Sequence, residues 1–185
     1  MILLHWYALF VETGQEETVQ RSLKQQFDPT ILMSLVPKRK VPEKKMGHTQ
    51  HVLRKMFPGY VLIQTSMNAD RYHSLRRIPH VLRMLTNGRK NEHNPESFQL
   101  SSIHDVEIAH LLKLLDATEI LEYSTLQILS NSNIHVVAGP LQGMENLIKK
   151  VDRHKNRATL QLPFLGEPRS IEVGIHIMYP PRTSE

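Results

Sequence analysis

Two cations, two aromatic side chains and a forced bend lie together in the stretch RKMFPGYVLI at residues 54–63. Pro58 and Gly59 require a bend that the interior of a regular strand does not tolerate. We expect this bend to expose Phe57 and Tyr60 together as an aromatic platform beside a positive edge. Such a surface is suited to holding a protein partner next to nucleic acid. The alternative is a hairpin whose aromatic side chains belong to the core.

The second group of candidate residues is the basic arm, which we define as residues 37–48. Pro37 and Pro42 stiffen this arm and oppose helix formation. A hairpin formed here would let the cations follow a phosphate backbone, whereas the alternative is a solvated, lysine-rich loop. More cations follow the sharp turn predicted at residues 139–143, where glycine can take a positive φ. The candidate nucleic-acid-binding residues are Lys38, Arg39, Lys40, Lys44, Lys45, Arg54, Lys55, Arg76, Arg77, Lys149, Lys150, Arg153, Lys155 and Arg157.

No residue pattern indicates catalysis or a metal site. The chain contains no cysteine, which excludes disulfides, thiol catalysis and cysteine-based metal sites and favours a reducing compartment. Residues 139–143 lack the Gly-Lys-Ser/Thr ending of a phosphate-binding loop, and no GxSxG occurs. The 11 histidines show no HExxH motif and no compelling ligand spacing. We therefore expect a protein that is not an enzyme and has neither cofactor nor metal.

Charge is distributed unevenly along the chain, although the net total is only +5. Residues 1–90 hold 15 Lys and Arg against 6 Asp and Glu, residues 91–120 hold 1 against 6, and residues 121–185 hold 7 against 6. A basic first half favours a polyanion such as RNA or DNA over solubility alone. The apolar start at residues 1–11 is too short to span a bilayer and lacks a basic lead-in. We therefore expect a cytoplasmic protein with no membrane partner.

Hydrophobic periodicity predicts an α+β fold for the first two thirds of the chain. Residues 4–11 predict a strand, and Thr13 with Glu16 predicts a capping box for the helix that follows. A strand at residues 52–65 is expected to run through the Pro-Gly bend. A later helix is expected to bury the stripe Ile108, Leu111, Leu112 and Leu115. The order strand-helix-strand-strand-helix-strand-helix predicts an antiparallel sheet flanked by helices.

After residue 115 the helical period gives way to a period of two. Apolar residues alternate at 158–162 and again at 171–177, with turn signals between the runs. Several short strands within about 60 residues predict a small β-barrel. We expect an N-terminal domain at 1–116, a short linker at 117–122 and a C-terminal β-barrel domain at 123–185.

Three segments occur in a particular order along the chain. They are WYALFVETGQE at 6–16, the stretch at 54–63, and VVAGPLQGME at 136–145 with VDRHK at 151–155. Together they resemble the NusG family of transcription elongation factors, the first two matching its N-terminal domain and the third its KOW domain. The resemblance covers nearly the whole chain and is least clear at 116–133. Residues 151–158 and 13–17 look most similar to the specialised LoaP-like antiterminators.

The resemblance implies an N-terminal domain that sits on the clamp helices of RNA polymerase. A factor that favours the closed clamp should reduce pausing and termination, because closure competes with pausing. We favour a core position for Trp6, and a polymerase contact for Phe57 and Tyr60. The residues implied to edge or shape the polymerase contact are Trp6, Tyr7, Phe57, Pro58, Gly59 and Tyr60.

The resemblance also implies partners for the cations, but here several alternatives stay open. The basic arm would face upstream DNA and the non-template strand. The KOW cations favour a structured leader RNA of particular operons and a protein partner equally. A housekeeping member would instead recruit Rho or the ribosome, and Asn146 departs from the glycine usual in the family. A ribosome-associated KOW protein and an enzyme are further alternatives, and we expect a monomer.

Overall fold

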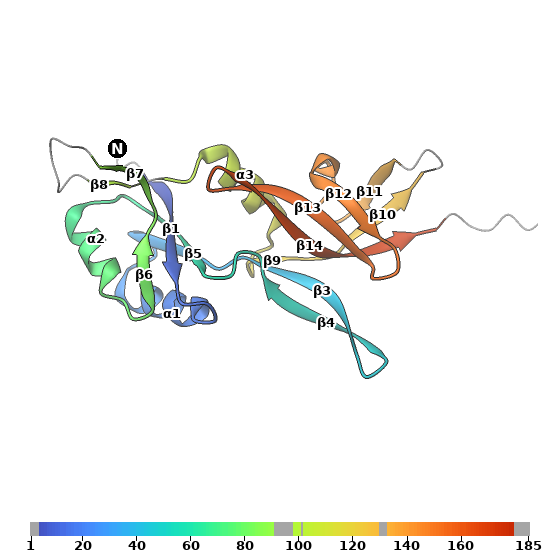
Figure 1. The fold of residues 1–185 in the computed structure, drawn as a ribbon, viewed down its shortest axis with the longest axis horizontal. Coiled ribbons are helices and arrows are strands. Elements are labelled where there is room, and N and C mark those ends of the chain that lie inside the picture. The colour runs from blue at the N-terminus through green and yellow to red at the C-terminus, as the bar shows by residue number, and fades with distance from the viewer. Residues whose placement is uncertain (1–3, 91–97, 101, 130–132, 180–185) are drawn as a thin grey trace, which may run out of the picture. The chain divides into compact units, whose positions relative to one another are not determined.

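The computed structural model describes residues 4–90, 98–100, 102–129 and 133–179 (Figure 1). The chain divides into two compact units, and each unit joins segments that are distant in sequence. The first unit comprises Met1–Val36 and Phe57–Ile108, and the second comprises Pro37–Met56 and Ala109–Glu185. The predicted α+β class is confirmed, because the described ranges combine β-sheets with three α-helices.

The first unit is built on an antiparallel sheet with the strand order β2-β5-β1-β6. Alternation along the central strand β1 sends Tyr7, Leu9 and Val11 into one hydrophobic core. Val19 and Leu23 enter the same core from α1, as the predicted i, i+4 stripe requires. The elements are β1 (His5–Val11), α1 (Glu16–Gln26), β2 (Leu32–Leu35), β5 (Tyr60–Thr65), α2 (Ala69–Arg76) and β6 (Val81–Met84).

Two further strands and the third helix follow in the sequence. The buried residues of this helix include Ile108, Leu111 and Leu114, whereas Leu112 is 42% exposed. The predicted stripe is therefore wrong at Leu112, since Leu114 is buried instead, and the predicted Leu115 is half-buried just after the helix ends. The elements are β7 (Thr86–Lys90), β8 (Phe98–Leu100), which pairs antiparallel with β7, and α3 (Asp105–Leu114).

The basic arm belongs to an antiparallel hairpin in the second unit (Figure 1). This hairpin consists of β3 (Lys38–Lys45) and β4 (His48–Lys55), and β3 also pairs in parallel with β9 (Ile120–Leu121). The hairpin alternative for the basic arm is thus confirmed. The prediction of one strand from 52 to 65 is wrong, because β4 and β5 belong to different sheets. The extended conformation is interrupted between β4 and β5, where Gly59 has a φ of +83°.

The C-terminal part of the second unit is a five-stranded sheet with the order β11-β10-β14-β13-β12. The period of two is confirmed, since Ala158, Leu160 and Leu162 are all buried and pair with β14. No strand pairing among the described residues joins β11 to β12, so the expected closed barrel is not found. The elements are β10 (Ser124–Ile128), β11 (Ile134–Ala138), the 3-10 helix η1 (Glu145–Leu147), β12 (Ile148–Asp152), β13 (Arg157–Phe164) and β14 (Glu167–Met178).

None of the helices in the described ranges is long and apolar enough to cross a membrane.

Candidate functional site

The bend at Pro58-Gly59 is a tight β-turn at the entrance to β5. The amide of Tyr60 donates to the carbonyl of Phe57 at 3.2 Å, and Gly59 has a φ of +83°. Proline at the second position and a positive-φ glycine at the third are the signature of a type II turn. An L-residue with a side chain would be strained at Gly59, which explains the residue type there.

A buried carboxylate anchors this turn to the start of α1. Glu16 is fully buried, and its Oε1 accepts a hydrogen bond from the amide of Gly59 at 2.7 Å. Its Oε2 accepts from the amide of Gly14 at 3.0 Å. The amide of Val11 in turn donates to the carbonyl of Gly59 at 2.8 Å. Gly59 is therefore bonded through both its amide, to Glu16 of α1, and its carbonyl, to Val11 of β1, and these two bonds fix what we call the clamped turn.

This anchoring replaces the predicted capping box. The N-cap of α1 is Gln15, and no side chain caps the helix. The capping prediction was wrong because Glu16 uses both carboxylate oxygens elsewhere, one of them on a residue 43 positions away. The acid that the sequence assigns to local helix capping instead fixes the position of the aromatic turn.

The exposed platform predicted at the turn does not form as expected. Phe57 is only 7% exposed, whereas Pro58 is exposed and Tyr60 is half-buried. Of the two central residues of the turn only Pro58 is exposed, because Gly59 is buried with its amide bonded to Glu16 and its carbonyl bonded to the Val11 amide. Trp6 and Tyr7 are buried too, so the core position favoured for Trp6 is confirmed.

A smaller aromatic and cationic group lies beside the turn across three strands of the sheet. Phe10 is directly opposite both Tyr60 and Arg83 in the strand registers. The rings of Phe10 and Tyr60 have centroids 5.5 Å apart, and the guanidinium of Arg83 lies 5.2 Å from the Phe10 centroid. Leu82, next along β6, is 51% exposed. The sequence did not predict that Phe10 and Arg83 lie beside Tyr60, because only the strand pairing brings them together.

The hairpin cations are divided between internal ion pairs and solvent. Arg54 donates twice to the carboxylate of Glu43, at 2.9 and 2.7 Å, and this contact raises the pKa of Arg54 and lowers that of Glu43. Lys40 donates to both oxygens of Glu122 at 3.1 Å. Burial lowers the pKa of the Arg39 guanidinium. At the far end of the hairpin Lys44 and Lys45 are exposed.

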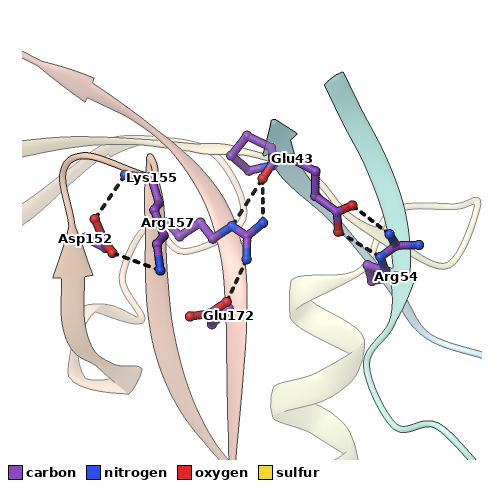
Figure 2. Close-up of polar contacts among 7 residues, drawn as sticks. Glu43, Arg54, Asp152, Lys155, Arg157 and Glu172 are labelled. Carbon is purple, nitrogen blue, oxygen red and sulfur yellow. Dashed lines mark hydrogen bonds and ion pairs between the residues drawn. The ribbon is translucent and has the colours of Figure 1, made fainter. Parts of the chain in front are cut away.

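Arg157 joins the hairpin to the C-terminal sheet within the second unit (Figure 2). Its Nε and Nη2 donate to the carbonyl of Pro42 at 3.2 and 2.6 Å, and its Nη1 donates to Glu172 at 2.8 Å. The Arg157 side chain is 21% exposed. This predicted nucleic-acid ligand therefore uses three of its five N–H donors for internal contacts.

An aromatic contact that the sequence did not predict reinforces the same junction. The hydroxyl of Tyr123 lies 2.6 Å from Nδ1 of His51 on β4, and its ring stacks on His176 of β14 with centroids 4.7 Å apart. Burial raises the pKa of Tyr123. Gly174 leaves room for that ring, since a Cβ there would collide with Tyr123 and lie 2.8 Å from the Lys40 carbonyl.

Two aspartates organise turns in the second unit. Asp152 Oδ1 accepts from the amide of Lys155 at 3.0 Å (Figure 2). It also accepts from the amide of His154 at 3.0 Å, and these bonds lower the Asp152 pKa, that from Lys155 most. Asp116 accepts from the hydroxyl and amide of Thr118 at 2.7 and 2.8 Å, and the hydroxyl bond is the main cause of its lowered pKa. The Asp152 turn connects β12 to β13 and contains the cations Arg153 and Lys155.

The other predicted cations lie near the β12–β13 turn, on α2 and the residue after it, and at the ends of β3 and β4. Lys150 and Arg153 are exposed on β12 and its turn, next to Lys149, whose ammonium donates to the Asn146 carbonyl at 3.1 Å. Lys155 is near Asp152, with 3.9 Å between Nζ and Oδ2. The hairpin cations and the β12–β13 cations thus belong to the same unit of the structure, the second. The first unit contains Arg77 and Arg76, whose guanidinium lies 5.9 Å from the centroid of the Tyr72 ring. In the second unit Lys38 of β3 is opposite Lys55 of β4 on one side and Ile120 of β9 on the other.

Within the described residues no three His, Cys, Asp or Glu side chains gather in a way that could hold a metal ion.

Comparison with known proteins places this chain in a family. Residues 4–110 match the NusG family model, which is described as "Transcription termination factor nusG", and this match covers more than half of the chain. The matched region includes the aromatic turn, its Glu16 anchor and the whole β3–β4 hairpin. The protein therefore belongs to the NusG family.

Curated relatives extend the similarity over most of the chain. The "Transcription termination/antitermination protein NusG" of Pasteurella multocida is 25% identical over 173 residues, covering 91% of this chain and 90% of the relative. The proteins of the same name from Buchnera aphidicola subsp. Baizongia pistaciae and Pseudomonas aeruginosa are 27% and 26% identical, covering 91% of this chain and 91% and 93% of their own lengths. A solved structure described as "Domain interaction in Thermotoga maritima NusG" shares the fold, with a TM-score of 0.54 and 17% identity over 93% of this chain and 94% of that chain.

Proposed function

We propose that this protein is a transcription elongation and antitermination factor that binds RNA polymerase and a leader RNA, and so suppresses pausing and termination in particular operons. The observation that carries the proposal is the family match over residues 4–110, which contains the entire clamped turn. A factor of this kind acts by binding, and the proposal assigns it no catalytic step, cofactor or metal. It would act as a monomer in the cytoplasm.

The polymerase contact is proposed for the sheet edge around the clamped turn. Pro58 is exposed, and Tyr60 and Phe10 present ring surface next to the Arg83 guanidinium. Aromatic and arginine side chains commonly supply most of the binding energy of an interface. Phe57, Trp6 and Tyr7 would support this surface from beneath, and the clamp helices of the polymerase would be its partner.

The nucleic-acid contact is proposed for the exposed cations of the second unit. Lys44 and Lys45 lie on the hairpin, and Lys150 and Arg153 lie near the β12–β13 turn. We assign the five-stranded sheet to a KOW module at residues 123–185, preceded by a linker at 117–122 and an N-terminal domain at 1–116. Structured RNA is held through phosphates, while unpaired loops and bulges supply sequence recognition. Non-template DNA is a further partner of the hairpin cations.

The deciding experiment is transcription in vitro through a terminator with purified RNA polymerase. Templates with and without the native upstream leader are compared, each with and without the full-length protein. Leader-dependent readthrough is the expected result. Readthrough that is equal on both templates would refute a leader-directed role, and the absence of any effect on either template would refute the antitermination proposal.

A variant pair tests the polymerase surface directly. Tyr60→Ala should weaken polymerase retention in a pull-down, because it removes the ring that packs on Phe10. Tyr179→Ala is the control, since Tyr179 is 66% exposed and belongs to the other unit. Equal retention of both variants by intact polymerase at low ionic strength would move the contact away from the turn.

One observation favours a second candidate, a general elongation factor whose C-terminal sheet recruits Rho or the ribosome. Leu129, Met178 and Tyr179 are exposed by 43, 45 and 66% at the adjacent ends of β10 and β14. Exposed apolar clusters of this kind are typical of protein-binding surfaces. Under this alternative, RNA binding by the purified protein is weak and not sequence-selective, and Met178→Ser lowers binding to Rho or to ribosomes.

A further inference from the structure

Among the large apolar residues of the described ranges, the most exposed lies at the tip of the β3–β4 hairpin. Met46 is 91% exposed. It forms a two-residue loop with Gly47, because Lys45 and His48 are the last paired residues of the two strands. The φ angles of Met46 and Gly47 are +49° and +81°. Positive φ at both loop positions defines a type I′ turn, the geometry that suits the twist of a hairpin.

Methionine is an unfavourable choice for that position on two counts. The first residue of a type I′ turn prefers Asn or Asp, which tolerate the left-handed region better than a long side chain does. The Met46 side chain is also exposed to water in the folded protein, so its burial contributes nothing to the free energy of folding. Folding therefore does not explain Met46, whereas contact with a partner would.

The surroundings of Met46 specify the chemistry of that partner. Lys44 and Lys45 are exposed immediately before it, and His48 is exposed after it. The nearest acid along the strand is Glu43, whose carboxylate is already occupied by two hydrogen bonds from Arg54. The tip thus combines an apolar point with uncompensated positive charge, which is complementary to a polyanion that has an apolar interior.

We propose that Met46 is a wedge that inserts between adjacent base pairs of double-stranded DNA from the minor groove, while Lys44 and Lys45 contact the flanking phosphates. Apolar side chains on basic, architectural DNA-binding elements unstack a base step in this way and kink the duplex. An antiparallel β-ribbon is narrow enough to follow a DNA groove. The inference deepens the hairpin's proposed nucleic-acid contact and rests on it.

The test uses the full-length protein and two short duplexes of matched length, one with a central TA step and one with a central A-tract. A 2-aminopurine next to the centre reports unstacking. TA steps are unstacked more easily than A-tracts, so the wild-type protein should bind the TA duplex more tightly and raise its fluorescence. Met46→Asn removes the wedge while placing Asn-Gly, the preferred type I′ pair, in the loop, so the hairpin stays folded.

Met46→Asn is expected to bind the TA duplex at least about tenfold more weakly, the loss that follows from no longer burying one methionine side chain. It should also lose the preference for TA and the fluorescence rise. Met46→Leu should retain all three. Lys44→Gln with Lys45→Gln should flatten the salt dependence by about 0.9 log units per lost phosphate contact and keep the preference for TA.

Equal behaviour of Met46→Asn and the wild type would overturn the wedge. So would wild-type binding that is salt-dependent but shows no step preference, although the proposed function would survive that result. A normal DNA response with weaker polymerase retention by Met46→Asn would assign the tip to a protein partner and also overturn the proposal. No binding of any nucleic acid by the wild type would refute both the wedge and the proposed nucleic-acid function.

Discussion

Replacing Glu16 by glutamine tests whether the buried carboxylate positions the aromatic turn. Both carboxylate oxygens of Glu16 accept hydrogen bonds, from the amides of Gly59 and Gly14. Glutamine has nearly the same shape, but only one of its two terminal atoms is an acceptor. Its NH2 group would therefore face a backbone N–H, and one buried donor would lose its partner.

The expected cost follows from those two bonds. A hydrogen bond to a charged group contributes about 1.5–3 kcal/mol, and an unsatisfied buried donor costs about 1–3 kcal/mol. Glu16→Gln keeps one bond in a weaker, neutral form and loses the other. We expect the free energy of unfolding of the first unit to fall by about 2–4 kcal/mol. With a urea m-value of about 2 kcal/mol/M, the middle of the usual range, the unfolding midpoint should fall by roughly 1–2 M.

Urea denaturation followed by tryptophan fluorescence measures this directly. The chain has a single tryptophan, Trp6, which is buried in the first unit that contains the turn. Asp70→Asn is the matched control, because Asp70 is likewise an acid in the first turn of a helix but is exposed. It should cost no more than about 0.3–1 kcal/mol, the usual effect of a charge at a helix N-terminus.

The comparison between the two variants decides the outcome. If Glu16→Gln and Asp70→Asn shift the urea midpoint equally, Glu16 is only another first-turn acid and the clamped turn is not a structural anchor. If Glu16→Gln is the more destabilised, it should also bind polymerase less well under conditions where it remains folded. The turn would then have lost its fixed position.

Three further predictions concern the second unit. Gly174→Ala should destabilise it by about 1–3 kcal/mol in thermal denaturation, because the new methyl group collides with Tyr123. The Asp116 and Asp152 carboxylates have pKa values lowered from 3.8. The stability that they add is therefore present above pH 3.8 and is lost as the pH falls through their folded pKa. Thermal midpoints measured from about pH 7 to about pH 2 should fall in that acidic range, and less steeply in Asp116→Asn. Arg157→Gln should speed amide hydrogen exchange in β3 and leave the salt dependence of RNA binding unchanged, since its charge is paired internally.

Local patterns predicted the elements whose burial follows from their own periodicity. The apolar alternation of β1 and the i, i+4 stripe of α1 are both visible in the sequence, and both face one core. The alternation in β13 likewise predicted the buried residues Ala158, Leu160 and Leu162. In these elements the nearest neighbours in sequence already determine which face is apolar, so no long-range information is needed.

The aromatic turn shows where that approach stops. The sequence correctly indicated a bend at Pro58-Gly59, but not which of its residues point outward. That outcome depends on the turn type and on Glu16, which binds a residue 43 positions away. The capping-box pattern offered a local role for the same acid, and the tertiary contact displaced it. A pattern that describes one helix end contains no information about a competing partner from another element.

The same limit applies to counting cations, and it changes what the basic residues mean for function. Lys40 contacts Glu122, Arg54 contacts Glu43, and Arg157 contacts Glu172 together with the Pro42 carbonyl, a residue 115 positions away. A cation held by a carboxylate releases few counterions when nucleic acid binds, because its charge is already compensated.

The salt dependence of binding should therefore reflect the exposed cations rather than all 14 candidates. Of the candidates in the second unit, Lys44 and Lys45 at the hairpin tip and Lys150 and Arg153 near the β12–β13 turn are the exposed ones for which the described residues show no hydrogen bond or ion pair. If these four supply the phosphate contacts, the slope of log affinity against log salt should be about −3 to −4 on duplex nucleic acid. A slope several times steeper would mean that the internal ion pairs open on binding, and that the hairpin leaves the C-terminal sheet when nucleic acid arrives.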